Sequence, residues 1–442
     1  MIPMRRSLPP LALLLGLLAP GLAVAGGFAI DEHGPVATAM AGAVAAKADD
    51  AAAVFYNPAG LAARPGGSVS LGLTLSIVEL RTRSGGLTPI TTATTGSPVS
   101  ALPDLFVGAR LHRRLAVGIG LFSQYGSSLS WSAEGQRLDG EMTTAVPFPG
   151  RFVGRTTRLG TLTLNPTLAY QPSPAVAFGL GVDVLFGTLE LERTVRFGDA
   201  EGGARLAGNG RQVGMNFGVL VEPLPGLLAA ALTYRSGGPL DFDLKARFTP
   251  PPELASVVKD QRAKTSLALP HHLTFGLATR PMPGLTITTD VHLTLWSDFV
   301  ALRIEFPSSS LPPLVAPARW RDAWSARIGA EYLLLRRYGR FAVRGGVGYD
   351  INPVPAETLS PTAPGQDRLF FAGGLGYAIR GFGLDLAYLG AVLRDRVSTL
   401  AEYPALYGGQ VHVVSVALSY EWGRSGCACP RCGGCDGRCC VR

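Results

Sequence analysis

The feature that most constrains this chain is a two-residue alternation of apolar and polar side chains that recurs along it. The segment 285–295 places Leu, Ile, Thr or Val at every second position, with Thr, Asp and His between them. The segments 324–332 and 414–422 repeat the pattern. Successive side chains of a β-strand point to opposite faces, so these segments predict strands with one apolar face and one polar or glycine face. A soluble β-sandwich and a membrane β-barrel are both consistent with such strands.

The lengths of the connections separate these two folds. We expect fourteen strands, joined alternately by short turns and long loops. Connections that alternate strictly between short turns and long loops are the signature of an outer-membrane barrel, whereas a sandwich has no reason to order its connections in this way. An even number of strands also closes the sheet without an unpaired edge in lipid. The expected fold is therefore all-β, a 14-stranded antiparallel transmembrane β-barrel over residues 68–422. The expected strands are 68–80, 103–112, 114–124, 156–171, 174–192, 209–222, 226–248, 265–280, 285–306, 320–334, 340–351, 367–380, 382–396 and 411–422.

Aromatic residues gather towards the ends of these strands, where the interfacial girdles of membrane barrels lie. The expected long loops lie between the strands at the opposite end from the short turns. The aromatic residues are Trp296, Phe299, Trp320, Trp324, Tyr332, Tyr349, Tyr377, Tyr388, Tyr420 and Trp422. The expected long loops are 81–102, 125–155, 193–208, 249–264, 307–319, 352–366 and 396–410.

The amino terminus has the features of a secretory signal peptide. Arg5 and Arg6 precede the apolar run 11–18, Pro20-Gly21 interrupts it, and 23–25 reads Ala-Val-Ala. We expect cleavage after this site, so that 1–25 is removed; an uncleaved anchor helix is the alternative. Only 16% of residues are charged and 47% are hydrophobic, which together with export indicates the outer membrane of a Gram-negative bacterium. The formal charge of +8 is too diffuse to indicate nucleic-acid binding.

Residues 26–67 do not alternate and are rich in Ala and Gly. We expect a helix over 36–47 that carries almost no large apolar side chain. Such a small, closely packing segment has a natural place in the barrel lumen, as a hatch that plugs it; a periplasmic extension is the alternative. Asn57 precedes a proline, which favours an extended or turn conformation. Its amide and the carboxylates of Asp49 and Asp50 are expected to meet polar groups of the lumen.

Four segments, in order along the chain, carry a more specific signal. They are GGFAIDEHGPVATAMAGAVAAKADDAAAVFYNPAGLA, LNPTLAYQPSPAVAFGLGVD, LPHHLTFGLATRPMPGLTITTDVHLTLWSDF, and RIGAEYLLLRRYGRFAVRGGVGYDINPVPAETLSPTAPGQDRLFFAGGLGYAIRGFGLDLAY. Together they resemble the FadL/TodX family of outer-membrane transporters for long-chain fatty acids and other hydrophobic compounds. With the final strand, the resemblance runs from about 26 to 422.

The resemblance implies a fourteen-stranded barrel with an amino-terminal hatch and passive uptake of a hydrophobic ligand. In that family, extracellular loops capture the ligand, which moves to a lumen site against the hatch and leaves sideways through a gap in the wall. The family's hatch motif matches Asn57, Pro58 and Ala59. The gap maps to the third strand, 114–124, although relatives often have proline where this chain has Gln124.

Ligand-lining side chains are expected on the hatch and on the loop 125–155, and the loop residues could instead pack on their neighbours. Alternation points Arg327 and Arg344 into the lumen, where an arginine could bind a fatty-acid carboxylate. The alternative is that both arginines pair with inward-facing carboxylates and brace the barrel. The ligand-lining candidates are Phe28, Val54, Phe55 and Leu61 of the hatch and Trp131, Met142, Phe148 and Phe152 of the loop.

No catalytic arrangement is recognisable in the sequence. There is no G-x-S-x-G motif, and the six histidines have no Ser or Asp spacing that indicates hydrolysis, so we expect neither an enzyme nor a cofactor. A general diffusion porin or a structural outer-membrane protein is the alternative function. We expect a monomer whose partners are a hydrophobic small molecule, outer-membrane lipids and the outer-membrane assembly machinery.

The cysteines lie in the tail 423–442, after the last expected strand. Their spacing suits either zinc binding or three disulfides, and an oxidising periplasm favours disulfides, so no metal is expected. The six residues are Cys427, Cys429, Cys432, Cys435, Cys439 and Cys440.

Overall fold

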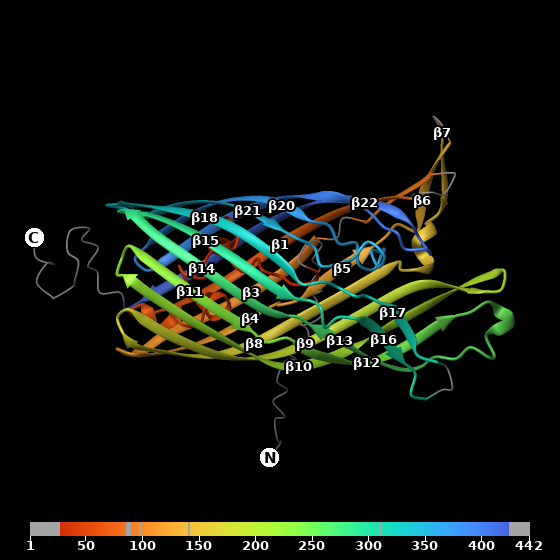
Figure 1. The fold of residues 1–442 in the computed structure, drawn as a ribbon, viewed down its shortest axis with the longest axis horizontal. Helices are drawn as coiled ribbons and strands as arrows, with labels where there is room; N and C mark the ends of the chain where they lie inside the picture. The colour runs from red at the N-terminus through yellow and green to blue at the C-terminus, as the bar shows by residue number, and fades with distance from the viewer. Residues whose placement is uncertain (1–26, 85–89, 97–98, 140–141, 309–311, 424–442) are drawn as a thin grey trace, which may run out of the picture.

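The computed structural model, which describes residues 27–84, 90–96, 99–139, 142–308 and 312–423, is one closed antiparallel barrel (Figure 1). The first strand, β1 (Gly67–Ser84), pairs with the last, β22 (Ala405–Trp422), over its whole length. This pairing closes the sheet and confirms the predicted 14-stranded antiparallel barrel. The predicted signal peptide and the cysteine tail lie outside the described residues.

Five of the wall strands consist of two consecutive segments, and the others are continuous. Around the barrel, the wall consists of β1, β3 (Val99–His112), β4 (Leu115–Phe122) with β5 (Gly126–Ser130), β8 (Thr156–Ser173), β9 (Val176–Phe197), β10 (Ala200–Leu224), β11 (Leu228–Arg235) with β12 (Gly238–Thr249), β14 (His271–Met282) with β13 (Gln261–Leu269), β15 (Leu285–Leu295) with β16 (Ala301–Glu305), β18 (Ala323–Arg336) with β17 (Leu314–Pro317), β19 (Gly339–Asp350), β20 (Arg368–Ile379), β21 (Phe382–Val397) and β22.

The remaining short elements lie at the end of the barrel that carries the long connections (Figure 1). They are β2 (Ile90–Thr94), β6 (Glu134–Asp139), β7 (Met142–Pro147), η3 (Pro149–Phe152) and η4 (Pro252–Leu254). The expected long loop 193–208 is wrong, because β9 and β10 continue as a hairpin to a turn at Gly198. Opposite charges face each other across this hairpin, with Arg205 bound to Glu190, and such cross-strand pairs extend the ladder.

The outer face of the wall is apolar. Outward side chains such as Leu71, Leu168 and Phe186 are half exposed, whereas their neighbours along the strand point inward and are buried. This alternation, apolar outside and small or polar inside, is that of a transmembrane barrel. Across the described ranges, no helix is long and apolar enough to cross a membrane.

Residues 27–66, which we call the hatch, lie inside the barrel and are drawn in red in Figure 1. They contain only three short helices. The predicted helix over 36–47 is wrong after its first turn, because Ala41 and Gly42 adopt φ angles of 56° and 78° and turn the chain. Gly42 lies against the guanidinium of Arg327, where a Cβ atom would clash. The helices are α1 (Pro35–Ala39), α2 (Ala53–Tyr56) and α3 (Gly60–Ala63).

Glycines on the inner face of the wall bring the strands close to the hatch. A Cβ on Gly118 would lie 2.7 Å from side-chain atoms of Leu61 and Val54, and one on Gly346 would clash with the backbone of Ala41. Small residues on both sides therefore pack the lumen tightly, which explains why the hatch is rich in Ala.

Candidate functional site

The Asn-Pro-Ala motif fixes the hatch to the wall. Asn57 is fully buried and extended, as expected for a residue before proline. Its amide nitrogen donates to the carbonyl oxygens of Ala45 (2.9 Å) and of Val219 in β10 (3.3 Å), and Ala59 N donates to its oxygen (3.1 Å). The motif thus joins two parts of the hatch to one wall strand.

Two wall glycines, Gly179 of β9 and Gly218 of β10, form the seat of this motif. A Cβ on Gly218 would overlap the Asn57 oxygen, and one on Gly179 would overlap the backbone between Pro58 and Ala59. The family motif therefore depends on glycines that are distant in sequence, and sequence reasoning did not identify them.

We expect Gly218→Ala to weaken hatch docking by about 1–3 kcal/mol, because Asn57 must move away from its hydrogen bonds. Hydrogen exchange of hatch amides should then be faster, while exchange of the wall stays unchanged. Gly203→Ala on the same strand is the control, since its nearest atom would be 3.7 Å away. Equal exchange in the two variants would contradict the proposed seat.

An apolar chamber of about 150 Å³ lies between the hatch and the long connections. Gly27 and Phe28 of the hatch line it, and the segment 352–365 covers it. Among the described residues that line it, none is ionisable. Besides Phe28, its largest apolar side chains are Leu129, Leu159, Leu189, Leu191, Leu267, Leu302, Phe299 and Trp320.

Of the predicted ligand-lining residues, Phe28 lines this chamber. Val54, Phe55 and Leu61 belong to a different cluster of the hatch, which packs on Phe106 and Phe122 of the wall. Phe55 also borders a smaller cavity of about 50 Å³ that contains Asp31, Arg235 and His272.

None of the predicted loop residues whose side chains the structure describes lines the chamber. Trp131 and Phe148 are buried and stack at 5.4 Å, and Trp131 Nε1 donates to the carbonyl oxygen of Pro361 in the covering segment. This is the arrangement of an apolar loop that packs on its neighbours. Phe152 lies between the guanidinium groups of Arg151 and Arg196, and the side chain of Met142 lies outside the described part of the structure.

Three aromatic residues predicted for the girdle lie in the lumen instead. Trp296, Phe299 and Trp320 are buried and surround Phe28, with the Phe28 and Trp296 rings 4.5 Å apart. The girdle prediction is wrong for them because the chain turns inward after β15. Trp324, Tyr332, Tyr377, Tyr388, Tyr420 and Trp422 are exposed on the wall.

Arg327 and Arg344 both bind carboxylates. Arg327 Nη2 lies 2.6 Å from Asp31 of the hatch and 3.4 Å from Asp350 of the wall. Arg344 lies 2.7 Å from both Glu331 and Asp385. This geometry is the bracing arrangement that the sequence left open as the alternative to ligand binding.

A second hatch carboxylate has an arginine partner that sequence reasoning missed. Arg368 Nη2 lies 2.8 Å from Glu32, and its Nε lies 2.6 Å from Asp350, which it shares with Arg327. Burial alone would raise the pKa of Asp31, but the Arg327 guanidinium, together with the nearby His292 and His272, holds that pKa below the ordinary value. The adjacent acids Asp31 and Glu32 thus fix the hatch to the wall.

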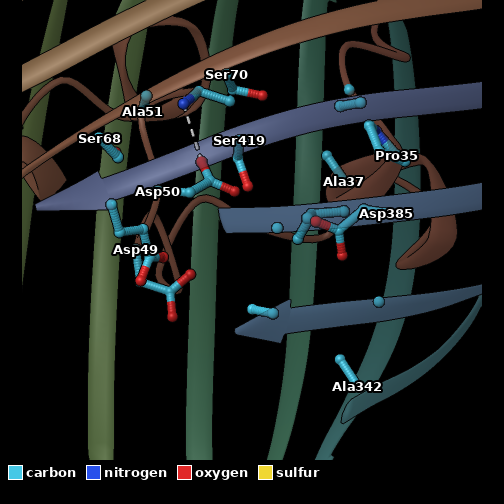
Figure 2. Close-up of a pocket in the computed structure, with 18 of the residues that line it drawn as sticks. Pro35, Ala37, Asp49, Asp50, Ala51, Ser68, Ser70, Ala342, Asp385 and Ser419 are labelled. Carbon is cyan, nitrogen blue, oxygen red and sulfur yellow. Dashed lines mark hydrogen bonds between the residues drawn. The ribbon is translucent and has the colours of Figure 1, made fainter. Parts of the chain in front are cut away.

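A charged cavity of about 120 Å³ lies on the other side of the hatch, at the end with the short turns. Figure 2 shows hatch residues Asp49 and Asp50 near Ser68 and Ser419 of the wall, as expected for carboxylates that meet polar lumen groups. Lys47 connects the hatch to the wall, because its amine lies 2.5 Å from Asp49 of the hatch and 3.3 Å from Glu331 of the wall. The lumen is therefore apolar on one side of the hatch and charged on the other.

Backbone pairing between wall strands is broken beside Gln124, at the end of the expected third strand. Pairing between β3 and β4 begins at Leu105 and Leu121, and the described residues Val99–Asp104 pair with β1 alone. Between β4 and β5 the chain pairs with the hatch instead: Ile30 N donates to Gln124 O (3.0 Å) and Gly126 N to Phe28 O (2.9 Å). Backbone pairing with the hatch, rather than a proline, thus accompanies this break.

His33 lies in an apolar environment on the hatch. Its ring is 4.2 Å from the Phe55 ring and 5.4 Å from the Phe122 ring, and Nε2 is 3.2 Å from Ile30 O. Burial lowers the pKa of His33 to about 4, although the nearby Asp31 carboxylate acts in the opposite direction. The docked hatch therefore holds this histidine neutral.

We expect hatch docking to weaken on acidification, because a released hatch would titrate His33 near its ordinary pKa of 6.5. The free energy of docking has its full value above pH 6.5. It falls by on the order of 3 kcal/mol as the pH drops from there to about 4. Hydrogen exchange of hatch amides, corrected for intrinsic rates, measures it. His33→Gln, which does not titrate, should flatten the dependence; an equal dependence in both proteins would refute the role of His33.

Within the described ranges, no group of three or more His, Cys, Asp or Glu side chains is placed to hold a metal ion. The architecture defines a class: a 14-stranded outer-membrane-type barrel whose lumen contains its own amino-terminal segment and an apolar chamber. The chain belongs to the outer membrane protein transport protein family (OMPP1/FadL/TodX), whose model matches residues 16–397. This match confirms the resemblance found in the sequence, and the protein is an outer-membrane transport protein.

Related proteins carry similar descriptions. The long-chain fatty acid transport protein of Escherichia coli K12 is 26% identical over 322 residues, which cover 64% of this chain and 68% of that protein. The Salmonella typhi protein of the same name is 28% identical over 313 residues, covering 64% and 67%. These relatives are transporters rather than enzymes.

Solved structures show the same fold. A Pseudomonas aeruginosa FadL homologue superposes with a TM-score of 0.77 at 16% identity, covering 90% of this chain and 100% of that one. The P. putida toluene transporter TodX gives a TM-score of 0.66 at 18% identity, covering 89% and 99%.

Proposed function

We propose that this protein is a channel for the passive uptake of hydrophobic compounds, the class that includes long-chain fatty acids and hydrocarbons. The observation that carries this proposal is the apolar chamber, which rests on the hatch residues Gly27 and Phe28. The relatives are named as transporters of long-chain fatty acids or toluene, which agrees with an apolar cargo.

In the proposed path, extracellular loops capture the ligand, the chamber holds it against the hatch, and it leaves sideways through the wall. A watery pore is a poor path, because each exposed CH₂ group costs roughly 0.8 kcal/mol of favourable burial. The wall break beside Gln124 adjoins Phe28 through the hatch pairing, so the chamber floor and the break share one segment. Release into the membrane would keep the ligand covered throughout, and no energy source is needed.

Native mass spectrometry and solvent extraction of the purified protein test this proposal. We expect a hydrophobic compound to copurify with the wild-type protein and to be lost from Leu189→Asp, which places a carboxylate in the chamber. Leu71→Asp, on the outer face, is the control for detergent or lipid that adheres to the wall. Absence of any bound compound, together with liposome swelling by small sugars, would instead indicate a general diffusion porin.

A further inference from the structure

Three basic side chains lie together on the outer face of the wall. They are Lys245 and Arg247 of β12 and Arg262 of β13, and we call them the basic patch. All three are exposed, whereas the residues on either side of Lys245 along the strand are buried. Lys245 lies directly opposite Arg262, and Arg247 lies directly opposite Arg205 of β10. The patch therefore places positive charges opposite each other across two pairs of strands.

Like charges directly opposite each other on neighbouring strands are destabilising, and the adjacent hairpin avoids them. There, Arg205 lies opposite Glu192 and 2.6 Å from Glu190. Lys264, next to the patch, also has a carboxylate partner, because Asp243 lies 3.8 Å away. Within the described ranges, by contrast, no ion pair joins a residue of the basic patch to a carboxylate. An anion from outside the chain could therefore relieve the repulsion within the patch.

The basic patch lies beyond the lipid-facing band, at the end of the barrel that carries the long connections (Figure 1). Val213 is the last large apolar side chain on the outer face of β10, and Arg211 is the next outward residue. Lys245 lies opposite Ala207, further along the same strand. The distance from Val213 to Ala207 is roughly 15 Å along the membrane normal for strands tilted by about 40°.

This height indicates which anionic layer the basic patch meets. The long connections of outer-membrane barrels are extracellular, so the patch faces the outer leaflet. A phospholipid head group is only roughly 5–8 Å thick and would not reach it. The outer leaflet of this membrane consists of lipopolysaccharide, whose phosphate groups lie on the lipid A sugars and on the inner-core sugars above them. Those inner-core phosphates extend to the height of the patch.

We infer that the basic patch binds the phosphate groups of lipopolysaccharide. A guanidinium group binds phosphate through two parallel hydrogen bonds, and a lysine amine adds a point charge. The wall below the patch suits the acyl chains of the same molecule, because Val213 and Met215 are apolar and are 71% and 55% exposed. The outer face thus matches both the charged and the apolar part of the glycolipid. This inference concerns the outer face and is independent of the cargo in the lumen.

Native mass spectrometry of the purified full-length protein tests the inference. The probe is a rough lipopolysaccharide with a phosphorylated inner core, added in EDTA so that divalent cations do not bridge it to carboxylates. The triple variant Lys245→Gln, Arg247→Gln, Arg262→Gln should bind it at least roughly tenfold more weakly than the wild type. The same glycolipid, dephosphorylated with hydrofluoric acid, should bind the wild type as weakly as the intact glycolipid binds the triple variant.

The matched control removes three exposed arginines at the short turns, by Arg113→Gln, Arg336→Gln and Arg337→Gln. It changes the net charge equally and should bind the intact glycolipid as the wild type does. Equal weakening in the two triple variants would overturn the inference, because net charge alone would then explain the binding. Equal binding of the intact and the dephosphorylated glycolipid, or binding of neither by the wild type, would also overturn it.

A charge reversal separates binding from stability. In detergent without lipid, Arg262→Glu should raise the midpoint temperature of heat-modifiable migration, because an opposite-charge pair with Lys245 replaces a repulsive one. The same variant should bind the intact glycolipid at least roughly tenfold more weakly. Arg262→Gln is the control and should give a smaller change in both measurements. An Arg262→Glu protein that binds the glycolipid as tightly as the wild type would contradict the inference.

Discussion

Deletion of residues 26–62 is expected to leave a folded barrel whose ion conductance is at least roughly tenfold higher than that of the full chain. The wall should fold without the hatch because its closure lies between β1 and β22, both of which the deletion leaves intact. The hatch fills the lumen, and its removal would leave the charged inner face open to water. Planar-bilayer conductance measures the effect, and heat-modifiable migration on gels verifies the fold.

The matched control is deletion of residues 134–147, the β6–β7 hairpin. This hairpin lies at the long-loop end and contacts the barrel through β2, so its loss should leave conductance unchanged. Unchanged conductance in the hatch deletion, with the barrel still heat-modifiable, would refute the assignment of the hatch as a plug.

The barrel could be predicted from the sequence because its signals are local. Side-chain alternation and turn length depend on neighbouring residues, and both survive in the structure. Breaks within strands were missed where they follow from packing: the expected strand 265–280 is interrupted at Pro270, and 226–248 is interrupted at Ser236-Gly237. The tertiary structure, not the local pattern, determines where a long strand bends.

The candidate site was less predictable because its contacts join distant parts of the chain. Alternation placed Arg327 in the lumen correctly, but its partner Asp31 is 296 residues away and depends on how the hatch docks. Trp296 has the aromatic character of a girdle residue, and only the inward turn after β15 places it beside Phe28. The chamber itself depends on the segment 352–365, whose inward fold has no short-range signal that we recognise.

Arg327→Met is expected to release the hatch, at a cost of about 3–5 kcal/mol in docking energy. The substitution keeps a long side chain but leaves Asp31 and Asp350 facing each other without their shared guanidinium. A half-buried carboxylate that has lost its arginine is unfavourable, so the hatch should undock rather than keep Asp31 in place. Limited proteolysis within residues 27–66 and hydrogen exchange of the same amides measure the release.

The control is Arg303→Met, which removes an arginine from an exposed pair with Glu305 and should change stability by about 1 kcal/mol or less. Adding Asp31→Asn to Arg327→Met should restore much of the docking, because Asp31 is the carboxylate left without an arginine, whereas Asp350 keeps Arg368 at 2.6 Å. If Arg327→Met alone leaves the hatch as protected as the wild-type hatch, the ion pair between Arg327 and Asp31 does not hold it. Docking would then depend on the glycine seat of Asn57 and on close packing of the hatch alanines.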